Sequence, residues 1–90
     1  ASGVQKAGPH TYYIAGDTPI RDVNRQLDWD IPDEYAATVG GLVTHEARLI
    51  PAKGQHFDLH GYRFTVIDKN ARQIKRLRVE RLNAPGADKA

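Results

Sequence analysis

Cysteine and methionine are absent from the 90-residue sequence, and serine and tryptophan each occur once, as Ser2 and Trp29. Without cysteine the chain can form no disulfide framework, no thiolate metal site and no cysteine nucleophile. Because the only serine lies in a polar segment at the start of the chain, the usual serine triads are not available either. We therefore expect a protein that is not an enzyme.

Long hydrophobic runs are also absent. No apolar stretch approaches the roughly 20 residues that a membrane-spanning helix needs, and the first residues lack the apolar core of a signal peptide. Since the sequence does not begin with methionine, we expect a soluble piece of a longer protein. A composition of 40% hydrophobic and 27% charged residues is typical of one small globular domain. At this size, contacts with a partner or with a second copy are expected to add stability.

Charge is distributed unevenly along the chain. Residues 1–45 carry three basic and six acidic side chains, a net charge of −3, whereas residues 46–90 carry ten basic and five acidic side chains, a net charge of +5. Such a split can place an acidic and a basic surface on one small body, or it can produce two ordinary solvated faces. The first alternative favours association with a complementary surface.

Both ends of the sequence are expected to be irregular. Residues 1–10 contain two glycines, a proline and little apolar content, which is typical of a linker or a cloning remnant. Residues 83–90 are expected to be a flexible tail for the same reason. The domain itself is therefore predicted over residues 11–82, without internal repeats.

Within these bounds, hydrophobic periodicity and turn residues predict two helices and four strands. The expected elements are a strand at 11–15, a helix at 19–27, a helix from 38 that ends before Pro51, and strands at 55–59, 62–67 and 72–82. Thr18 is the expected cap of the first helix. The last segment also fits a helical period through Ile74 and Leu77, but its place after a strand and a turn favours an antiparallel hairpin.

These elements predict an α+β fold, with two short helices packed on a small antiparallel sheet. The pair Gly40-Gly41 lies inside the second helix, where each glycine costs about 1 kcal/mol of helix propensity relative to alanine. The pair lacks the lysine and the spacing of a phosphate-binding P-loop. We therefore expect another part of the backbone to pass close to it.

Several short motifs resemble one known family. In chain order they are Tyr13-Ile14-Ala15-Gly16, Thr18-Pro19-Ile20-Arg21-Asp22-Val23-Asn24, Thr38-Val39-Gly40-Gly41-Leu42-Val43, Arg48-Leu49-Ile50-Pro51, Gly54, Tyr62-Arg63-Phe64-Thr65-Val66 and Ile74-Lys75-Arg76-Leu77-Arg78-Val79. Their order and spacing over residues 12–81 are similar to those of the transporter-associated domain of the CorC/HlyC family. The Thr-x-Gly-Gly-Leu segment together with the Tyr-Arg-Phe strand is the most specific part of this resemblance.

The resemblance implies a fold like the small α+β subdomain of FAD-binding and transporter-associated proteins. It implies a place at the C-terminal end of a hemolysin-like or magnesium and cobalt efflux protein, after a transmembrane domain and a pair of cystathionine-β-synthase (CBS) domains, or at the end of some sodium/proton antiporters. The implied role is to modulate ion transport on the cytoplasmic side of the membrane. FAD itself is not expected, because only the fold relationship suggests it.

Two residues depart from the family pattern. Trp29 stands between Asp28 and Asp30, where the family usually has a leucine-rich helix end, and Ala47 takes a place often held by glycine. We expect both residues to lie near surfaces at which a partner specific to this member binds.

The acidic segment from Asp28 to Glu34 is a candidate metal site. The carboxylates of Asp28, Asp30, Asp33 and Glu34 are oxygen ligands of the kind that Ca²⁺ and Mg²⁺ prefer. The segment lacks the glycine and the ligand spacing of an EF-hand loop, and its last two acids can instead stabilise the start of the next helix. A sensor of a divalent cation or a small ligand is therefore the alternative to a regulatory module.

Histidine supplies a further candidate. In a strand, His56, Asp58 and His60 would share one face and could bind zinc or nickel. Alternate residues of a strand lie about 6.6 Å apart, which makes it difficult for all three to reach one ion. The simpler interpretation is the solvated side of an edge strand.

A basic group, Arg72, Lys75, Arg76, Arg78 and Arg81, is the candidate interaction surface. It could contact phosphate groups, lipid headgroups or an acidic protein surface. Nucleic acid is not expected, because no aromatic residues alternate with these charges. The simpler interpretation is the outer face of a terminal strand, where charge prevents edge-to-edge pairing. The expected partners are the CBS pair and the transmembrane domain of the parent chain, and a second copy of the domain.

Overall fold

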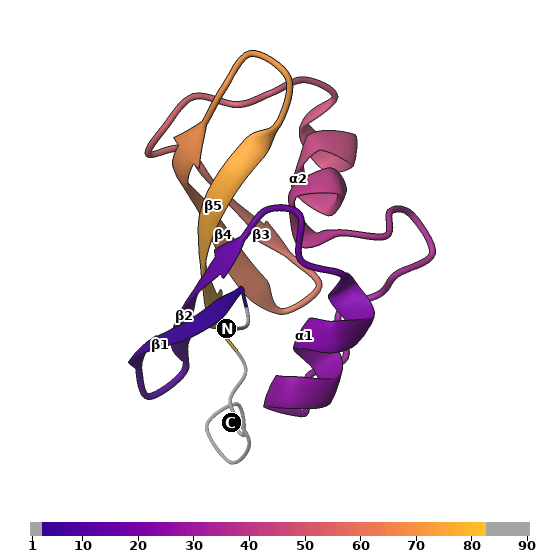
Figure 1. Ribbon diagram of the computed structural model, residues 1–90, viewed down its shortest axis with the longest axis vertical. Coiled ribbons are helices and arrows are strands. Elements are labelled where there is room, and N and C mark those ends of the chain that lie inside the picture. Colours follow the sequence, from indigo (N-terminus) through magenta and orange to yellow (C-terminus); the bar gives the residue numbers. More distant parts are fainter. Residues whose placement is uncertain (1–2, 83–90) are drawn as a thin grey trace.

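The computed structural model describes residues 3–82, which form a five-stranded antiparallel sheet with two helices on one side of it (Figure 1). The elements are β1 (Val4–Gly8), β2 (Thr11–Ala15), α1 (Ile20–Leu27), α2 (Val39–Ala47), β3 (His56–Leu59), β4 (Tyr62–Lys69) and β5 (Ile74–Arg81). The strand order is β1-β2-β5-β4-β3, so the last strand of the chain lies at the centre of the sheet. The predicted α+β class is confirmed. Within the described residues, no helix is both long enough and apolar enough to cross a bilayer.

Strand β1 differs from the sequence-based prediction, which places a linker at residues 1–10. Val4–Gly8 pairs antiparallel with β2, and Ala15 extends the ladder by donating its N–H to the carbonyl oxygen of Gly3 at 2.8 Å. The prediction of a linker is therefore wrong for this strand. Its polar composition conceals a strand because the stabilising partner, the free edge of β2, is a tertiary feature. The tail predicted at residues 83–90 lies outside the described residues.

The two helices begin in different ways. Pro19 is the N-cap of α1 and has extended backbone, and no side chain caps this helix. The prediction that Thr18 caps α1 is therefore wrong; Thr18 is buried and its backbone hydrogen-bonds to neighbouring segments. At α2, the hydroxyl oxygen of Thr38 accepts a hydrogen bond from the N–H of Gly41 at 3.0 Å, a regular N-cap. This helix ends at Ala47, as expected from the proline that follows.

The core lies between the helices and one face of the sheet. Its buried side chains come from both helices, the three central strands and the segment after α1: Ile14, Ile20, Val23, Trp29, Ile31, Val39, Leu42, Val43, Tyr62, Phe64, Val66, Ile74, Leu77 and Val79. Trp29 is only 8% exposed and packs against the rings of Tyr12 and Tyr62, with centroids 5.4 and 4.8 Å away. The expectation that Trp29 lies at a partner surface is therefore wrong, because the aromatic contacts draw it into the core.

A break in the register between β4 and β5 explains the ambiguous periodicity of the last strand. The ladder pairs Leu77 with Val66, Arg76 with Asp68 and Ile74 with Lys69. Each strand thus contains one unpaired extra residue, which is the signature of β-bulges. The bulge allows Ile74 and Leu77 both to face the core although they are three residues apart. The predicted strand is confirmed, and its helix-like spacing reflects the bulge.

Two glycines allow α2 to lie directly against the end of β2. The N–H of Gly40 donates to the carbonyl oxygen of Gly16 at 2.8 Å. A Cβ at position 40 would lie 2.8 Å from the same oxygen, and a Cβ at position 16 would overlap the carbonyl oxygen of Ile74. The close approach predicted from the glycine pair is confirmed, and it joins β2, α2 and β5 at backbone distance.

We expect Gly40→Ala to lower the free energy of unfolding by about 1–3 kcal/mol, because the new methyl group would press on backbone atoms that cannot move aside. The cost of the clash must outweigh the gain of about 1 kcal/mol in helix propensity that alanine brings. Urea unfolding measures the net change in the free energy of unfolding. Gly8→Ala is the matched control, since the atom nearest to a Cβ at position 8 is 3.5 Å away. A Gly40→Ala variant as stable as the parent would show that the contact is not tight.

Candidate functional site

The carboxylates of the acidic segment do not converge on one point. Asp28 follows α1 with a left-handed backbone (φ 57°), and Asp28, Asp33 and Glu34 are exposed residues. The Asp30 carboxylate instead accepts a hydrogen bond from the Tyr62 hydroxyl at 3.1 Å. Among residues 3–82, no three side chains of histidine, aspartate or glutamate are grouped so that they could hold a metal ion. As folded, the segment presents separate negative charges.

Tyr62 holds the start of this segment against the sheet. Its hydroxyl donates to the Asp30 carboxylate and also accepts from the Asp30 N–H at 3.2 Å. Asn24 of α1 adds a second attachment, because its side chain both donates to and accepts from the backbone of Ile31, each at 2.9 Å. Burial raises the pKa of Tyr62 above its ordinary value of 10.0, and the Asp30 carboxylate reinforces this, whereas the Asp30 N–H opposes it.

The histidine candidate is not assembled either. His56 and Asp58 lie on the solvent-facing side of β3, with His56 Nδ1 3.9 Å from Asp58 Oδ1. The Asp58 carboxylate is taken by Arg63, whose guanidinium donates two hydrogen bonds of 2.7 and 3.1 Å and lowers the pKa of that carboxyl. His60 lies in the β3–β4 turn, where its ring stacks on Tyr35 with centroids 6.2 Å apart. The simpler interpretation, a solvated edge strand, is confirmed for β3.

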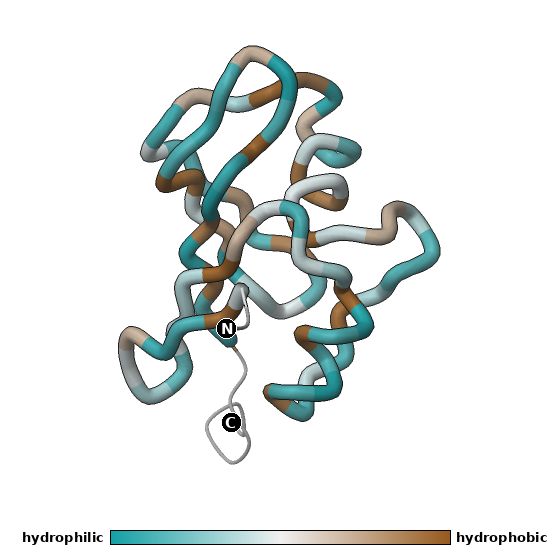
Figure 2. The backbone as a smooth tube through the Cα atoms, in the orientation of Figure 1, coloured by the Kyte–Doolittle hydropathy of each residue, from teal (hydrophilic) through white to brown (hydrophobic). Residues whose placement is uncertain are grey.

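The five residues of the basic group do not share one face. Arg72 lies in the turn before β5, Lys75 and Arg76 lie at the bulge, and Arg78 lies on the solvent-facing side of the sheet. Arg81 is half-buried near the end of the strand. Because β5 is central, its charges cannot protect a free edge, so that interpretation is wrong. Figure 2 shows that the segment joining β4 to β5 is largely hydrophilic.

No member of the basic group forms an ion pair within residues 3–82. The ion pairs of the described chain use Arg25, Lys53, His56 and Arg63 instead. The two predicted charged sets meet at one place, a shallow hollow of about 150 Å³ that Asp30 and Arg81 line together with Tyr62. The structure therefore brings one acidic and one basic candidate together and keeps the others apart.

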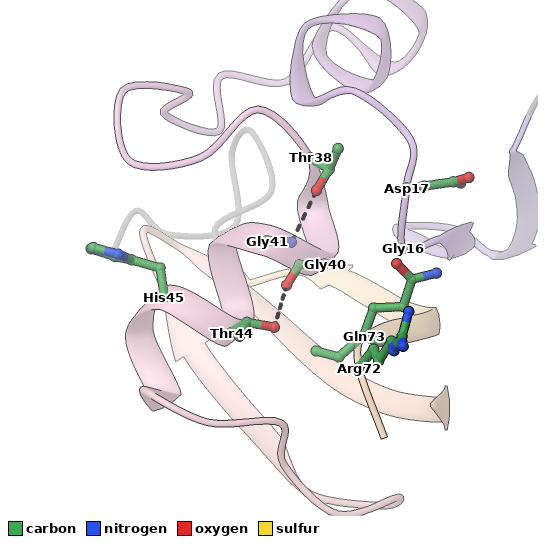
Figure 3. Close-up of a pocket in the computed structure, with 10 residues that line it drawn as sticks. Gly16, Asp17, Thr38, Gly40, Gly41, Thr44, His45, Arg72 and Gln73 are labelled. Carbon is green, nitrogen blue, oxygen red and sulfur yellow. Dashed lines mark hydrogen bonds between the residues drawn. The ribbon is translucent and has the colours of Figure 1, made fainter. Parts of the chain in front are cut away.

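A second hollow, of about 460 Å³, lies where α2 begins (Figure 3), and we call it the α2 hollow. Its lining comes from three separate segments: Gly16 and Asp17; Thr38, Gly40, Gly41, Thr44 and His45; and Arg72, Gln73 and Ile74. In Figure 3 the side chains of Arg72 and Gln73 lie beside Gly16, whereas those of Asp17 and His45 point away. The glycine pair was the only sign of this site in the sequence, because the third segment joins it only through the fold.

The first turn of α2 offers no free backbone donors to the α2 hollow. Its N–H groups, from Val39 to Leu42, donate to Thr18 O, Gly16 O, Thr38 Oγ1 and Thr38 O, at 2.8 to 3.1 Å. A phosphate-binding helix terminus needs such groups to be free. The glycine pair therefore serves helix packing.

Comparison with known proteins gives a consistent result. The family model described as "Transporter associated domain" (CorC_HlyC) matches residues 5–83. The magnesium and cobalt efflux protein CorC of Vibrio cholerae is 33% identical over 76 residues, which are 84% of this chain and 26% of that protein. Hemolysin C of Brachyspira hyodysenteriae is 33% identical over 73 residues, 80% of this chain and 27% of that protein. The chain thus spans about a quarter of the length of these relatives.

Solved structures show the same fold. The CorC-associated region from Neisseria meningitidis has a TM-score of 0.79 at 28% identity, with coverage of 89% of this chain and 99% of that one. The transporter-associated domain of a Xylella fastidiosa hemolysin, solved in complex with Mg²⁺ and Mn²⁺, has a TM-score of 0.75 at 24% identity and covers 91% of this chain and 100% of that one. The second likeness supports the fold alone.

We expect Tyr62→Phe to lower the free energy of unfolding by about 1 kcal/mol, because the Asp30 N–H and carboxylate both lose a hydrogen-bond partner. Tyr13→Phe is the control, since that hydroxyl has no hydrogen-bond partner among residues 3–82. The raised pKa of Tyr62 makes its contribution complete below about pH 10, and that contribution is lost as the pH rises through the raised pKa. The difference in unfolding free energy between wild type and Tyr62→Phe should therefore be full at neutral pH and shrink at alkaline pH. A difference that does not change with pH would contradict this role.

Proposed function

Because this chain belongs to the CorC/HlyC transporter-associated domain family, we propose that it is a non-catalytic regulatory module of a membrane ion transporter of the magnesium and cobalt efflux type. The matched region is about a quarter of the relatives named for efflux, which leaves room elsewhere in such proteins for the transport path. The module acts on the cytoplasmic side of the membrane by binding the CBS pair or the transmembrane domain of its parent, or a second copy of itself.

The observation that carries this proposal is the lack of internal acidic partners for the basic group. A cation that is paired inside its own domain has little attraction left for a partner, whereas Arg76 and Arg78 remain exposed and unpaired within residues 3–82. Unpaired charges of one sign attract a surface of the opposite sign and orient it. The acidic partner surface therefore lies on another domain or another copy.

The proposal predicts that Arg76→Glu/Arg78→Glu weakens binding of the 90-residue chain to the rest of its parent at least tenfold. Isothermal titration calorimetry at low and high salt measures this, and the wild-type affinity should fall as salt screens the charges. Lys6→Glu/Arg21→Glu changes the net charge equally at exposed positions of β1 and α1 and should bind like wild type. Equal affinities of wild type and the β5 variant would refute the contact. Sedimentation of the chain alone tests pairing with a second copy, which a monomer at low salt would exclude.

A divalent-cation sensor is the second candidate, because the Xylella fastidiosa domain, which shares this fold, was solved in complex with Mg²⁺ and Mn²⁺. In this chain the candidate ligands are Asp28, Asp30, Asp33 and Glu34. The segment would have to close on the ion, and Asp30 would have to give up its hydrogen bond to Tyr62.

This second candidate predicts that isothermal titration calorimetry of the chain with millimolar Mg²⁺, Mn²⁺ or Ca²⁺ gives a saturable heat of binding. Asp30→Ala/Asp33→Ala should abolish the heat because it removes two of the oxygen ligands. The control Asp17→Ala/Glu46→Ala removes two exposed acids outside the segment and should retain it. The absence of saturable heat in the wild type would eliminate the sensor.

A further inference from the structure

We propose that the α2 hollow binds a carboxylate group, with Arg72 as its anchor. The inference does not depend on the proposed regulatory role, because it concerns a site contained within the domain. Three observations support it: the shape of the hollow, the position of the Arg72 guanidinium, which forms no ion pair within residues 3–82, and the fact that the backbone N–H groups of the first turn of α2 already have acceptors.

The hollow has a rigid floor. Gly16 and Gly40 meet backbone to backbone, and the N–H of Gly40 donates to the carbonyl oxygen of Gly16 at 2.8 Å. The hydroxyl of Thr44 donates to the carbonyl oxygen of Gly40 at 2.9 Å, which further fixes this turn of α2. The volume of about 460 Å³ is within the range of sites that hold small molecules.

The β4–β5 turn holds Arg72 at the side of this floor. The side-chain oxygen of Asn70 accepts the N–H groups of Arg72 and Gln73, at 2.7 and 2.9 Å, and the N–H of Asn70 donates to the carbonyl oxygen of Gln73 at 2.9 Å. These three bonds define the turn, and both side chains that follow it line the hollow (Figure 3). The Arg72 guanidinium forms no ion pair within residues 3–82 and is therefore available to a ligand.

The available donors suit a carboxylate better than a phosphate. A guanidinium presents two parallel N–H groups that match the two oxygens of a carboxylate, and the amide of Gln73 adds a donor beside it. Phosphate sites draw on several backbone N–H groups, and those of the first turn of α2 are all occupied. Asp17 at the rim carries a negative charge, but its side chain points away from the α2 hollow (Figure 3).

The test is an NMR titration of the 90-residue chain with sodium succinate, with inorganic phosphate at the same ionic strength as the comparison anion. We expect saturable shifts of the Gly40, Gly41 and Gln73 amide signals at millimolar succinate. Arg72→Ala should weaken succinate binding at least tenfold. Arg72→Lys keeps the charge but loses the paired N–H groups, so its affinity for succinate should lie between those of wild type and Arg72→Ala. Arg21→Ala removes an exposed arginine of α1 and should bind like wild type.

Three results would overturn the proposal: no saturable shift with succinate, equal binding by wild type and Arg72→Ala, or phosphate binding at least as tight as succinate binding. A second probe, N-acetyl-glutamate amide, distinguishes the two sources of a carboxylate. Tighter binding of succinate would identify a free small molecule, and tighter binding of the glutamate derivative would identify an acidic side chain of a partner. Retained dispersion of the amide signals shows that each variant is folded.

Discussion

The backbone contact between Gly16 and Gly40 is the constraint on which the rest of the structure depends. A single hydrogen bond of 2.8 Å joins the end of β2 to the first turn of α2, and the carbonyl of Ile74 in β5 occupies the space that a side chain of Gly16 would need. Three elements that are distant in sequence are therefore held at backbone distance. The depth at which Leu42 and Val43 enter the core and the hollow beside the helix both follow from this distance.

A second set of contacts, centred on Tyr62, attaches the acidic segment to the sheet. Trp29 packs on this ring and Asp30 is bound to its hydroxyl, so the segment that departs from the family pattern is integrated into the core at its start and exposed farther on. Trp29, which the sequence suggested to be a surface residue specific to this member, is therefore part of the packed core. The acids that follow, Asp33 and Glu34, are exposed, and the Glu34 carboxylate raises the pKa of the neighbouring Tyr35 hydroxyl.

Candidate sites could be predicted from the sequence as sets of residues but not as arrangements. The sequence shows which side chains of the basic group and the acidic segment are charged, but their members diverge because a bulge turns part of β5 and because Tyr62 binds Asp30. The α2 hollow illustrates the converse. Gly40 and Arg72 are conspicuous separately, but nothing in the sequence indicates that they line one site.

The sequence by itself determined the features that depend on neighbours a few residues apart. These are the strand at Thr11–Ala15, the strand predicted at 62–67 and observed as Tyr62–Lys69, the end of α2 before Pro51, and the motifs of the family. Only the tertiary structure decided that Val4–Gly8 is a strand, that β5 is central, that Trp29 is buried and that the β4–β5 turn lies beside α2. The physical reason is that periodicity and capping arise from local backbone geometry, whereas strand neighbours and burial depend on contacts between segments far apart in the chain.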